Sequence, residues 1–345
     1  NPELEPEKTN SWEIGADLKF FKNMLALDFT YFNNYSDGLL MPFRLSGTSG
    51  YRYIYMNTAG MSSKGYEVVL YGKPLQRSVW VWDCYFNFTK IKNIVEKIPD
   101  DLEYFNIGWG DPWIVAMEGQ PYQSFFGYDW YKDENGNVII DDDPESDNYG
   151  FPLGFDKDTL VYLGKVNPDW VLGWTNNIMW KNLTFSFLLE YKKGGDISNE
   201  TRGSLYYFGA HKDTENREQG DEVVFEGVKE SDGSENDIPV VKDADWYFYG
   251  QGSAHSGQWA SFIEDASWLR LREISLTYTL GKGILGDEFI KGLDIYFAGK
   301  NLLLITKYSG IDPETSLWGA SNKQGIDLYN MPGTRSYTVG LRVDF

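Results

Sequence analysis

Apolar and polar side chains alternate along much of the chain, which is the pattern of β-strands whose two faces meet different surroundings. The clearest stretch runs from Val79 to Thr89, where large apolar side chains at even positions alternate with Asp83, Tyr85 and Asn87. The alternation predicts an all-β fold with nine strands, at about residues 11–20, 25–31, 62–72, 79–89, 168–180, 183–191, 274–280, 292–302 and 337–345.

The connections between these strands alternate between short and long. Connections without structure that exceed about 15 residues are uncommon in soluble domains, whereas transmembrane barrels have short periplasmic turns and long outer loops. The pattern therefore favours an antiparallel transmembrane β-barrel over a soluble sandwich with one wet face. Short turns are expected at about 21–23, 73–78, 181–182 and 281–291, and long connections at about 36–61, 90–167, 192–267 and 303–334.

An odd number of strands puts the two ends of the chain on opposite sides of the membrane, with residues 1–10 outside and Phe345 in the periplasm. Bacterial single-chain barrels have an even number of strands, and unpaired strand edges are costly in lipid. We therefore expect residues 1–345 to be the C-terminal portion of a longer barrel. The terminal Phe345 closes an alternating strand, a pattern that resembles an outer-membrane insertion signal.

Composition narrows the function classes. The net charge of -20 argues against nucleic acid as a partner, because phosphate contacts need clustered Lys and Arg. Cys84 is the single cysteine and His211 and His255 are the two histidines, so no thiolate cluster or multi-histidine metal site can form within the chain. No stretch approaches the roughly 18 apolar residues of a spanning helix.

Several segments resemble the SusC/RagA-like family of TonB-dependent outer-membrane transporters, and they follow one another in the expected order along nearly the whole chain. Gln123 departs from the family pattern, which has Gly at that place in the loop. The matching segments are Asn-Pro-Glu-Leu-Glu-Pro-Glu-Lys-Thr (1–9), Gly-Gln-Pro-Tyr (119–122) with Phe-Gly-Tyr (126–128), Gly-Lys-Val-Asn-Pro-Asp-Trp (164–170), Lys-Gly-Gly-Asp (193–196), Ala-Ser-Trp-Leu-Arg-Leu-Arg-Glu-Ile-Ser-Leu (266–276), Gly-Lys-Asn-Leu (299–302), Tyr-Ser-Gly-Ile-Asp-Pro-Glu (308–314) and Met-Pro-Gly-Thr-Arg (331–335).

The resemblance implies a barrel of about 22 strands in the outer membrane, with a plug domain and N-terminal strands that this chain lacks. It also implies a SusD-like surface lipoprotein as partner, and import of glycans or oligopeptides powered through the TonB complex. No cofactor is implied. An alternative class is a secreted all-β carbohydrate-binding protein, which would be soluble without detergent.

One long connection concentrates aromatic side chains. Sugars and peptides both stack on aromatic faces, so these residues are candidates for substrate binding, although a loop of this length also needs a small core of its own. The candidates are Trp109, Trp113, Tyr122, Phe125, Tyr128 and Trp130.

Acidic residues in the same connection raise the question of calcium. Gly136 is the fourth residue from Asp133, whereas a calcium loop of the EF-hand type has Gly at its sixth position. Asn135-Gly136 is better interpreted as a type I′ hairpin turn. Asp141 and Asp143 are left as a weak calcium candidate, and no other metal site is expected.

Two arginines, Arg270 and Arg272, alternate with leucines near the outer end of a strand. Contact with lipopolysaccharide or substrate is one interpretation. More often, such arginines pair with carboxylates such as Glu273 or extend their charged ends to the membrane boundary. An enzyme is not expected, because the chain has no G-x-S-x-G, H-E-x-x-H or phosphate-loop motif, and its carboxylate pairs are no more than an acidic chain offers by chance.

Overall fold

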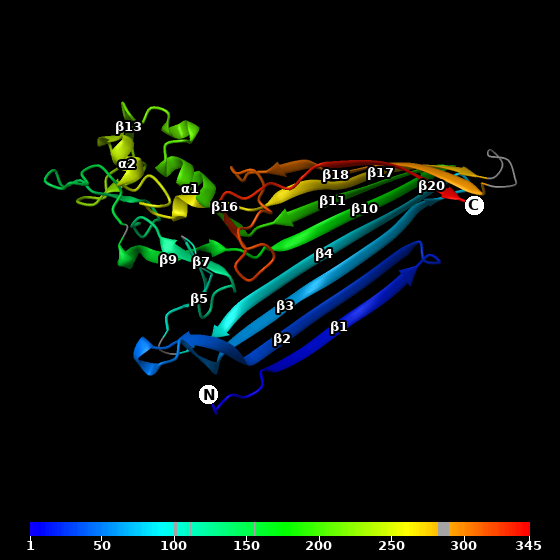
Figure 1. Ribbon diagram of the computed structural model, residues 1–345, viewed down its shortest axis with the longest axis horizontal. Helices are drawn as coiled ribbons and strands as arrows, with labels where there is room; N and C mark the ends of the chain where they lie inside the picture. Colours follow the sequence, from blue (N-terminus) through cyan, green and yellow to red (C-terminus); the bar gives the residue numbers. More distant parts are fainter. Residues whose placement is uncertain (100–101, 109, 111, 155, 282–289) are drawn as a thin grey trace.

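The computed structural model describes residues 1–99, 102–108, 110, 112–154, 156–281 and 290–345. A curved antiparallel sheet of nine strands forms the body of the molecule, and the smaller elements gather at one end of it (Figure 1). Each strand pairs with the next strand of the sheet along the chain, which confirms the nine predicted strands and their up-and-down order. In sheet order they are β1 (Lys8–Phe20), β2 (Leu25–Arg44), β3 (Tyr53–Gln76), β4 (Trp80–Lys97), β10 (Trp170–Trp180), β11 (Leu183–Lys193), β17 (Trp268–Gly281), β18 (Gly292–Thr306) and β20 (Ser336–Asp344).

The two faces of this sheet differ in polarity over most of its width. Side chains that pair across a sheet lie on the same face. One face carries an apolar row formed by directly paired residues from seven strands. The adjacent row, on the opposite face, is mostly polar and includes Asp28, Asn87, Glu190 and Arg270. The apolar row consists of Leu27, Leu70, Phe86, Trp174, Leu189, Leu271 and Leu303.

Aromatic contacts lie on this apolar face towards both ends of the strands. The Tyr31 ring lies 5.3 Å from that of Trp12 and 5.8 Å from that of Tyr66 between centroids. Near the turn at the other end, Trp80 stacks on Trp180 at 5.6 Å. Membrane barrels have aromatic girdles at both interfaces around an apolar band. The exposed apolar face therefore matches a lipid-facing wall, and the polar face matches a lumen.

A β-bulge lets β17 keep its apolar side chains on one face. Leu269 and Leu271 precede the bulge at odd positions, and Ile274 and Leu276 follow it at even positions. The extra residue is Arg272, since Leu271 and Glu273 oppose the consecutive residues 189 and 188 of β11. Bulges insert one unpaired residue and re-aim neighbouring side chains. Here the bulge shifts the alternation by one position, so the apolar face stays continuous.

The predicted loop 36–61 is wrong in its extent. β2 continues to Arg44 and β3 begins at Tyr53, so the two strands form a long hairpin beyond the body of the sheet. Two register shifts, on either side of Leu39, and the left-handed Gly38 interrupt the alternation there. The interruption hid this part of the hairpin in the sequence pattern.

The other long connections are folded. They build a four-stranded sheet, a three-stranded sheet, two small two-stranded sheets and two short helices at the loop end of the barrel wall. These elements are β5 (Phe105–Gly108), β6 (Trp113–Ala116), β7 (Ser124–Tyr128), β8 (Ile139–Ile140), β9 (Leu160–Lys165), β12 (Asp196–Asn199), β13 (Asp221–Val224), β14 (Val228–Lys229), β15 (Pro239–Lys242), β16 (Ile263–Asp265), β19 (Ile326–Asp327), α1 (Glu200–Tyr207) and α2 (Ala244–Phe248), with 3₁₀ turns at Gly47–Ser49, Lys157–Thr159, Lys212–Thr214 and Ala260–Phe262.

The expected type I′ turn at Asn135-Gly136 is also wrong in its type. Gly136 has φ of +87°, but Asn135 is not among the residues of positive φ, which a type I′ turn would require. The Gly136 N–H donates to the Asp133 carbonyl and the Asp133 N–H donates to the Asn137 carbonyl. This is a hairpin closed by a type I turn followed by a left-handed glycine.

Within the described residues, the helices are too short and too polar to cross a membrane.

Candidate ligand-binding site

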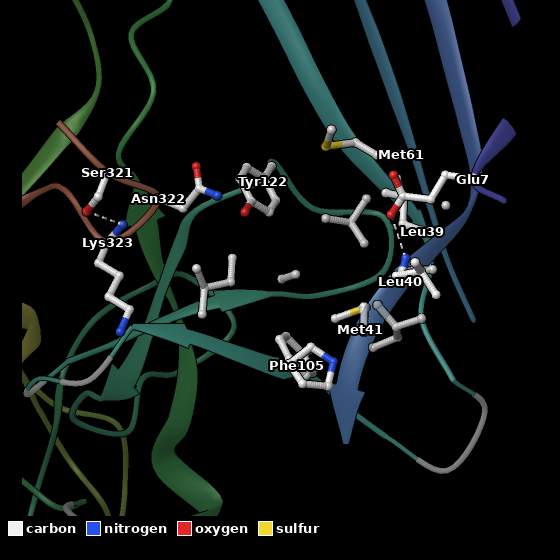
Figure 2. Close-up of a pocket in the computed structure, with 17 residues that line it drawn as sticks. Glu7, Leu39, Leu40, Met41, Met61, Phe105, Tyr122, Ser321, Asn322 and Lys323 are labelled. Carbon is white, nitrogen blue, oxygen red and sulfur yellow. Dashed lines mark hydrogen bonds between the residues drawn. The ribbon is translucent and has the colours of Figure 1, made fainter. Parts of the chain in front are cut away.

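A pocket of about 640 Å³ lies where the outer ends of β2, β3 and β4 meet the small sheet that contains β5 and β6 (Figure 2). This volume is within the range of about 300–1,000 Å³ usual for ligand sites. Most of the lining is aliphatic or sulfur-containing. The apolar lining consists of Leu39, Leu40, Met41, Pro42, Ala59, Gly60, Met61, Val95, Ile98, Phe105, Ile107, Ala116 and Tyr122.

The pocket opens on the polar, luminal face of the wall. Met61 shares its face with Tyr71, because no register shift separates them along β3. Val95 shares its face with Asp83 along β4 for the same reason. The Tyr71 hydroxyl donates to Asp83 at 2.6 Å, on the side of the sheet away from the apolar row. The apolar pocket is therefore an exception within a polar lumen, and it faces water rather than lipid.

Charged groups stand at two edges of this pocket. Glu7 lies beside β2, where its carboxylate accepts the Leu40 backbone N–H at 2.7 Å. Lys323 comes from the connection between β18 and β20, and its ammonium lies 5.3 Å from the centre of the Trp318 ring. Figure 2 places Glu7 and Lys323 on opposite sides of the pocket. Ser321 and Asn322 complete the polar edge beside Lys323.

Of the described aromatic candidates, Tyr122 lies in the wall of this pocket. Burial raises the pKa of its phenol. Phe125 is fully buried in a small core with Ile114, Val166 and Ile326. Trp109 lies outside the described residues.

Of the remaining candidates, Trp113 and Tyr128 pack on Trp259, and Trp130 lies against Phe225. Trp113 stacks on Tyr104 at 5.8 Å and meets Trp259 edge-on at 5.8 Å. The Tyr128 ring lies 4.9 Å from Trp259. Trp130 donates its indole N–H to Gln251 at 2.6 Å. These aromatic residues thus hold the outer elements together, and substrate binding by them stays a prediction.

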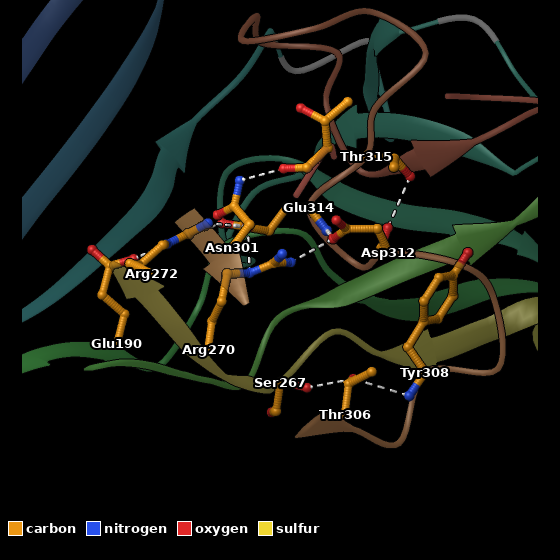
Figure 3. A network of polar contacts seen from close by, with 11 residues as sticks. Glu190, Ser267, Arg270, Arg272, Asn301, Thr306, Tyr308, Asp312, Glu314 and Thr315 are labelled. Carbon is orange, nitrogen blue, oxygen red and sulfur yellow. Dashed lines mark hydrogen bonds and ion pairs between the residues drawn. The ribbon is translucent and has the colours of Figure 1, made fainter. Parts of the chain in front are cut away.

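A network of charged side chains, in which Arg270 and Asp312 are buried, fixes the connection between β18 and β20 to the barrel wall (Figure 3). Arg270 donates to Asp312 at 2.7 Å, and its Nε lies 3.0 Å from a carboxylate oxygen of Glu314. Arg272 also donates to Glu314 and to Glu190 of β11. Both guanidinium groups lie over the Trp268 ring, at 5.4 Å and 4.8 Å.

The prediction that the two arginines pair with carboxylates is therefore confirmed, but the prediction of Glu273 as one of these carboxylates is wrong. Glu273 faces Lys300 at 3.7 Å instead. Sequence distance explains the error, because Asp312 and Glu314 lie about 40 residues further along the chain. The network holds the segment that carries Ser321 to Lys323, and so it fixes one edge of the pocket.

The acidic residues proposed for calcium are engaged in local hydrogen bonds. Asp141 accepts the Ser146 hydroxyl at 2.5 Å and the Asp143 backbone N–H at 3.1 Å. In the part of the chain that the structure describes, no three acidic, His or Cys side chains come together as a metal site would require. The weak calcium candidate Asp141 and Asp143 remains untested.

The terminal strand β20 places Phe345 at the end of the wall opposite to the outer elements (Figure 1). The Phe345 carbonyl accepts a hydrogen bond from Lys291 at 2.8 Å, and its side chain is largely exposed. A role in barrel insertion stays a prediction.

Sequence reasoning missed most of the pocket. The apolar run Leu39-Leu40-Met41-Pro42-Phe43 was the available signal, but it fell within the expected loop 36–61. The pocket also joins residues from four distant segments of the chain, and alternation along one strand gives no information on such contacts.

Comparisons with known proteins agree with this architecture. A family model described as "TonB dependent receptor-like, beta-barrel" matches residues 1–302. TonB-dependent receptor P3 of Formosa agariphila is 24% identical over the whole of this chain and 35% of its own length. TonB-dependent receptor SusC of Bacteroides thetaiotaomicron is 26% identical over the whole chain and 32% of its own length.

Among solved structures, the RagAB peptide transporter superposes with a TM-score of 0.73 at 21% identity, covering all of this chain and 36% of the matched one. At this identity the match shows the fold. The chain spans about a third of the length of the curated relatives that it matches. The family consists of receptors and transporters of the outer membrane. With its family match over residues 1–302 and its barrel wall of nine strands, this chain belongs to the TonB-dependent receptors, as part of their β-barrel.

Proposed function

We propose that the protein to which this chain belongs imports glycans or oligopeptides across the outer membrane, with energy supplied through the TonB complex. The chain supplies part of the barrel wall and part of the outer recognition surface. The remaining strands and a plug domain would come from the rest of the protein, in a barrel of about 22 strands.

The observation that carries this proposal is the difference between the two faces of the sheet. The apolar row from Leu27 to Leu303 suits lipid, and the luminal face holds a pocket of ligand size near the outer end of the wall. A passive pore would need no such pocket. A receptor that captures its cargo before moving it does need one.

A SusD-like surface lipoprotein is the proposed partner at the outer end of the wall. The solved relative is described as RagAB, a peptide transporter, and SusC is a curated relative. The outer elements of this chain expose aromatic side chains that a second protein could cover. Phe208 is 62% exposed and Tyr249 is 77% exposed.

The test is uptake by cells that carry the full-length protein. Fluorescent oligopeptides and oligosaccharides would be offered to a strain with intact TonB and to a strain without it. We expect uptake of one cargo class in the first strain and its loss in the second. Equal uptake in both strains would indicate a passive pore, and release of the protein from cells without detergent would favour the secreted carbohydrate-binding protein.

A further inference from the structure

We infer that the pocket between Glu7 and Lys323 binds the apolar side chains of an oligopeptide, so that the cargo of this protein is peptide rather than glycan. The inference rests on the proposed import function and names its substrate class. Four observations carry it: the chemistry of the wall, its adaptability, its position in the lumen and the charges at its edges.

The wall offers apolar surface and few hydrogen-bonding side chains. Sugars carry hydroxyl groups around each ring, and burying a hydroxyl without a hydrogen bond costs about 1–3 kcal/mol. A sugar site therefore needs several polar side chains among its aromatic ones. In the described lining, Met61, Val95, Ile98 and Ala116 have no side-chain group that can hydrogen-bond a hydroxyl. Apolar side chains of a peptide meet no such cost.

The wall can also adapt to side chains of different shape. Met41 and Met61 both line the pocket, and in Figure 2 they extend from neighbouring parts of the hairpin. Methionine is unbranched and flexible, and it fits irregular partners better than branched residues do. A protein that imports mixed peptides needs this tolerance, because the cargo differs from one molecule to the next.

The position of the pocket argues against a lipid occupant. Met61 and Val95 point to the same side of the sheet as Tyr71 and Asp83, opposite to the apolar row. An apolar site on this side can take its ligand only from the aqueous lumen. That excludes the acyl chains of the surrounding membrane, and it leaves a water-soluble ligand with apolar parts.

The edge charges match the two ends of a peptide. Glu7 contributes a carboxylate at one side, and Lys323 an ammonium on a segment held by Arg270 and Asp312. Lys323 is exposed and lies against Trp318, so its ammonium remains in contact with water. A peptide carries a free amine at one end and a carboxylate at the other. Neutral glycans carry neither.

Protection from thiol labelling tests this occupancy directly in the full-length protein. Cys84 is the single cysteine of this chain. The background for the experiment is the full-length protein with Cys84→Ser and with every cysteine outside this chain also replaced by Ser, and Met61→Cys then introduces one thiol in the pocket. The probes are a membrane-impermeant maleimide, a leucine-rich tetrapeptide, a glycine-serine tetrapeptide and a neutral oligosaccharide of similar mass. Thr48→Cys, at the exposed tip of the same hairpin, is the matched control.

With the leucine-rich peptide at about ten times its Kd, we expect labelling at position 61 to slow by about tenfold, because only the unoccupied fraction of the pocket reacts. The glycine-serine peptide and the oligosaccharide should have little effect, and labelling at position 48 should not change. Equal protection by the oligosaccharide, or no protection by the leucine-rich peptide, would overturn the inference. A thiol at position 61 that reacts only after denaturation would also overturn it, since another segment of the protein would then fill the pocket.

A second pair of variants tests the charge of Lys323 at the edge of the pocket and leaves the apolar lining unchanged. Lys323→Glu should weaken binding of the leucine-rich peptide by about fivefold, which is the size expected for an exposed charge pair. Lys323→Arg should preserve binding, and an amidated peptide should not distinguish the two variants. If both variants bind the unmodified peptide with the same affinity, Lys323 does not bind the carboxylate end of the peptide. TonB-dependent uptake without protection at position 61 would remove this inference alone, whereas loss of TonB dependence would remove the proposed function.

Discussion

Arg270 and Asp312 are almost fully buried, with side chains that are 5% and 7% exposed. Removing one partner of a buried ion pair leaves the other charge without compensation, which costs about 3–5 kcal/mol. We therefore expect Arg270→Met to lower the stability of the folded barrel by an amount of this order. The measurement is urea unfolding of the detergent-solubilised full-length protein, followed by gel mobility, together with protease cleavage between residues 307 and 335.

Two further variants show whether burial is the cause. Lys8 pairs with Glu5 at 3.2 Å, but both side chains are about 70% exposed, so Lys8→Met should leave the unfolding curve unchanged. Adding Asp312→Asn to Arg270→Met should recover part of the loss, because it removes the unpaired buried charge. Similar losses in Lys8→Met and Arg270→Met would refute this account of the network.

The pairing of β17 with β18 also shifts register, between Leu271 and Glu273, and Asn301 of β18 lies in this interruption. Its φ is +53°, and its side-chain amide donates to the Thr334 carbonyl at 3.1 Å. Asparagine tolerates the left-handed region, whereas a β-branched residue is strained there by about 1–3 kcal/mol. Asn301→Val should therefore lower the urea midpoint and loosen the pairing of Arg272 with Glu314.

Asn301→Gly is the matched control for backbone strain. Glycine adopts positive φ freely, so this variant loses the hydrogen bond to Thr334 and little else. We expect it to unfold close to the unmodified protein in the same titration. If the glycine and valine variants lose equal stability, the hydrogen bond rather than the backbone conformation is what matters at this position.

The strands of the wall were predictable because each one repeats a simple alternation. From Trp80 to Thr89 the pairing of β4 with β10 contains no register shift, and the strand begins at Trp80, within one residue of the predicted start. The extension of β2 and β3 was not predictable in this way, since Gly38 and the shifts around Leu39 break the period. In β17 the phase change between Leu271 and Ile274 was visible in the sequence, and only the bulge explains it.

The candidate site was less predictable than the wall. The sequence named Tyr122 as one of six aromatic candidates for substrate binding, but it gave no sign that Tyr122 would line a pocket together with Met61 and Lys323. Such contacts depend on how connections far apart in the chain pack together at one end of the sheet. The aromatic candidates mostly pack against other residues of the outer elements: Trp113 and Tyr128, for example, both contact Trp259.

At the scale of the whole molecule, two adjacent valines of β3 test which face meets lipid. Val68 pairs with Phe29 and Phe88 on the apolar face, and Val69 pairs with Asp28 and Asn87 on the other. An arginine that faces lipid near the middle of the bilayer costs about 2–4 kcal/mol, whereas an arginine in a polar lumen is tolerated. Val68→Arg should therefore reduce the folded protein in the outer membrane and its urea midpoint, while Val69→Arg should change both little. Because the two substitutions are chemically the same and one residue apart, a larger loss in Val69→Arg would mean that the faces are assigned the wrong way round, and the pocket at Met61 would then open towards lipid.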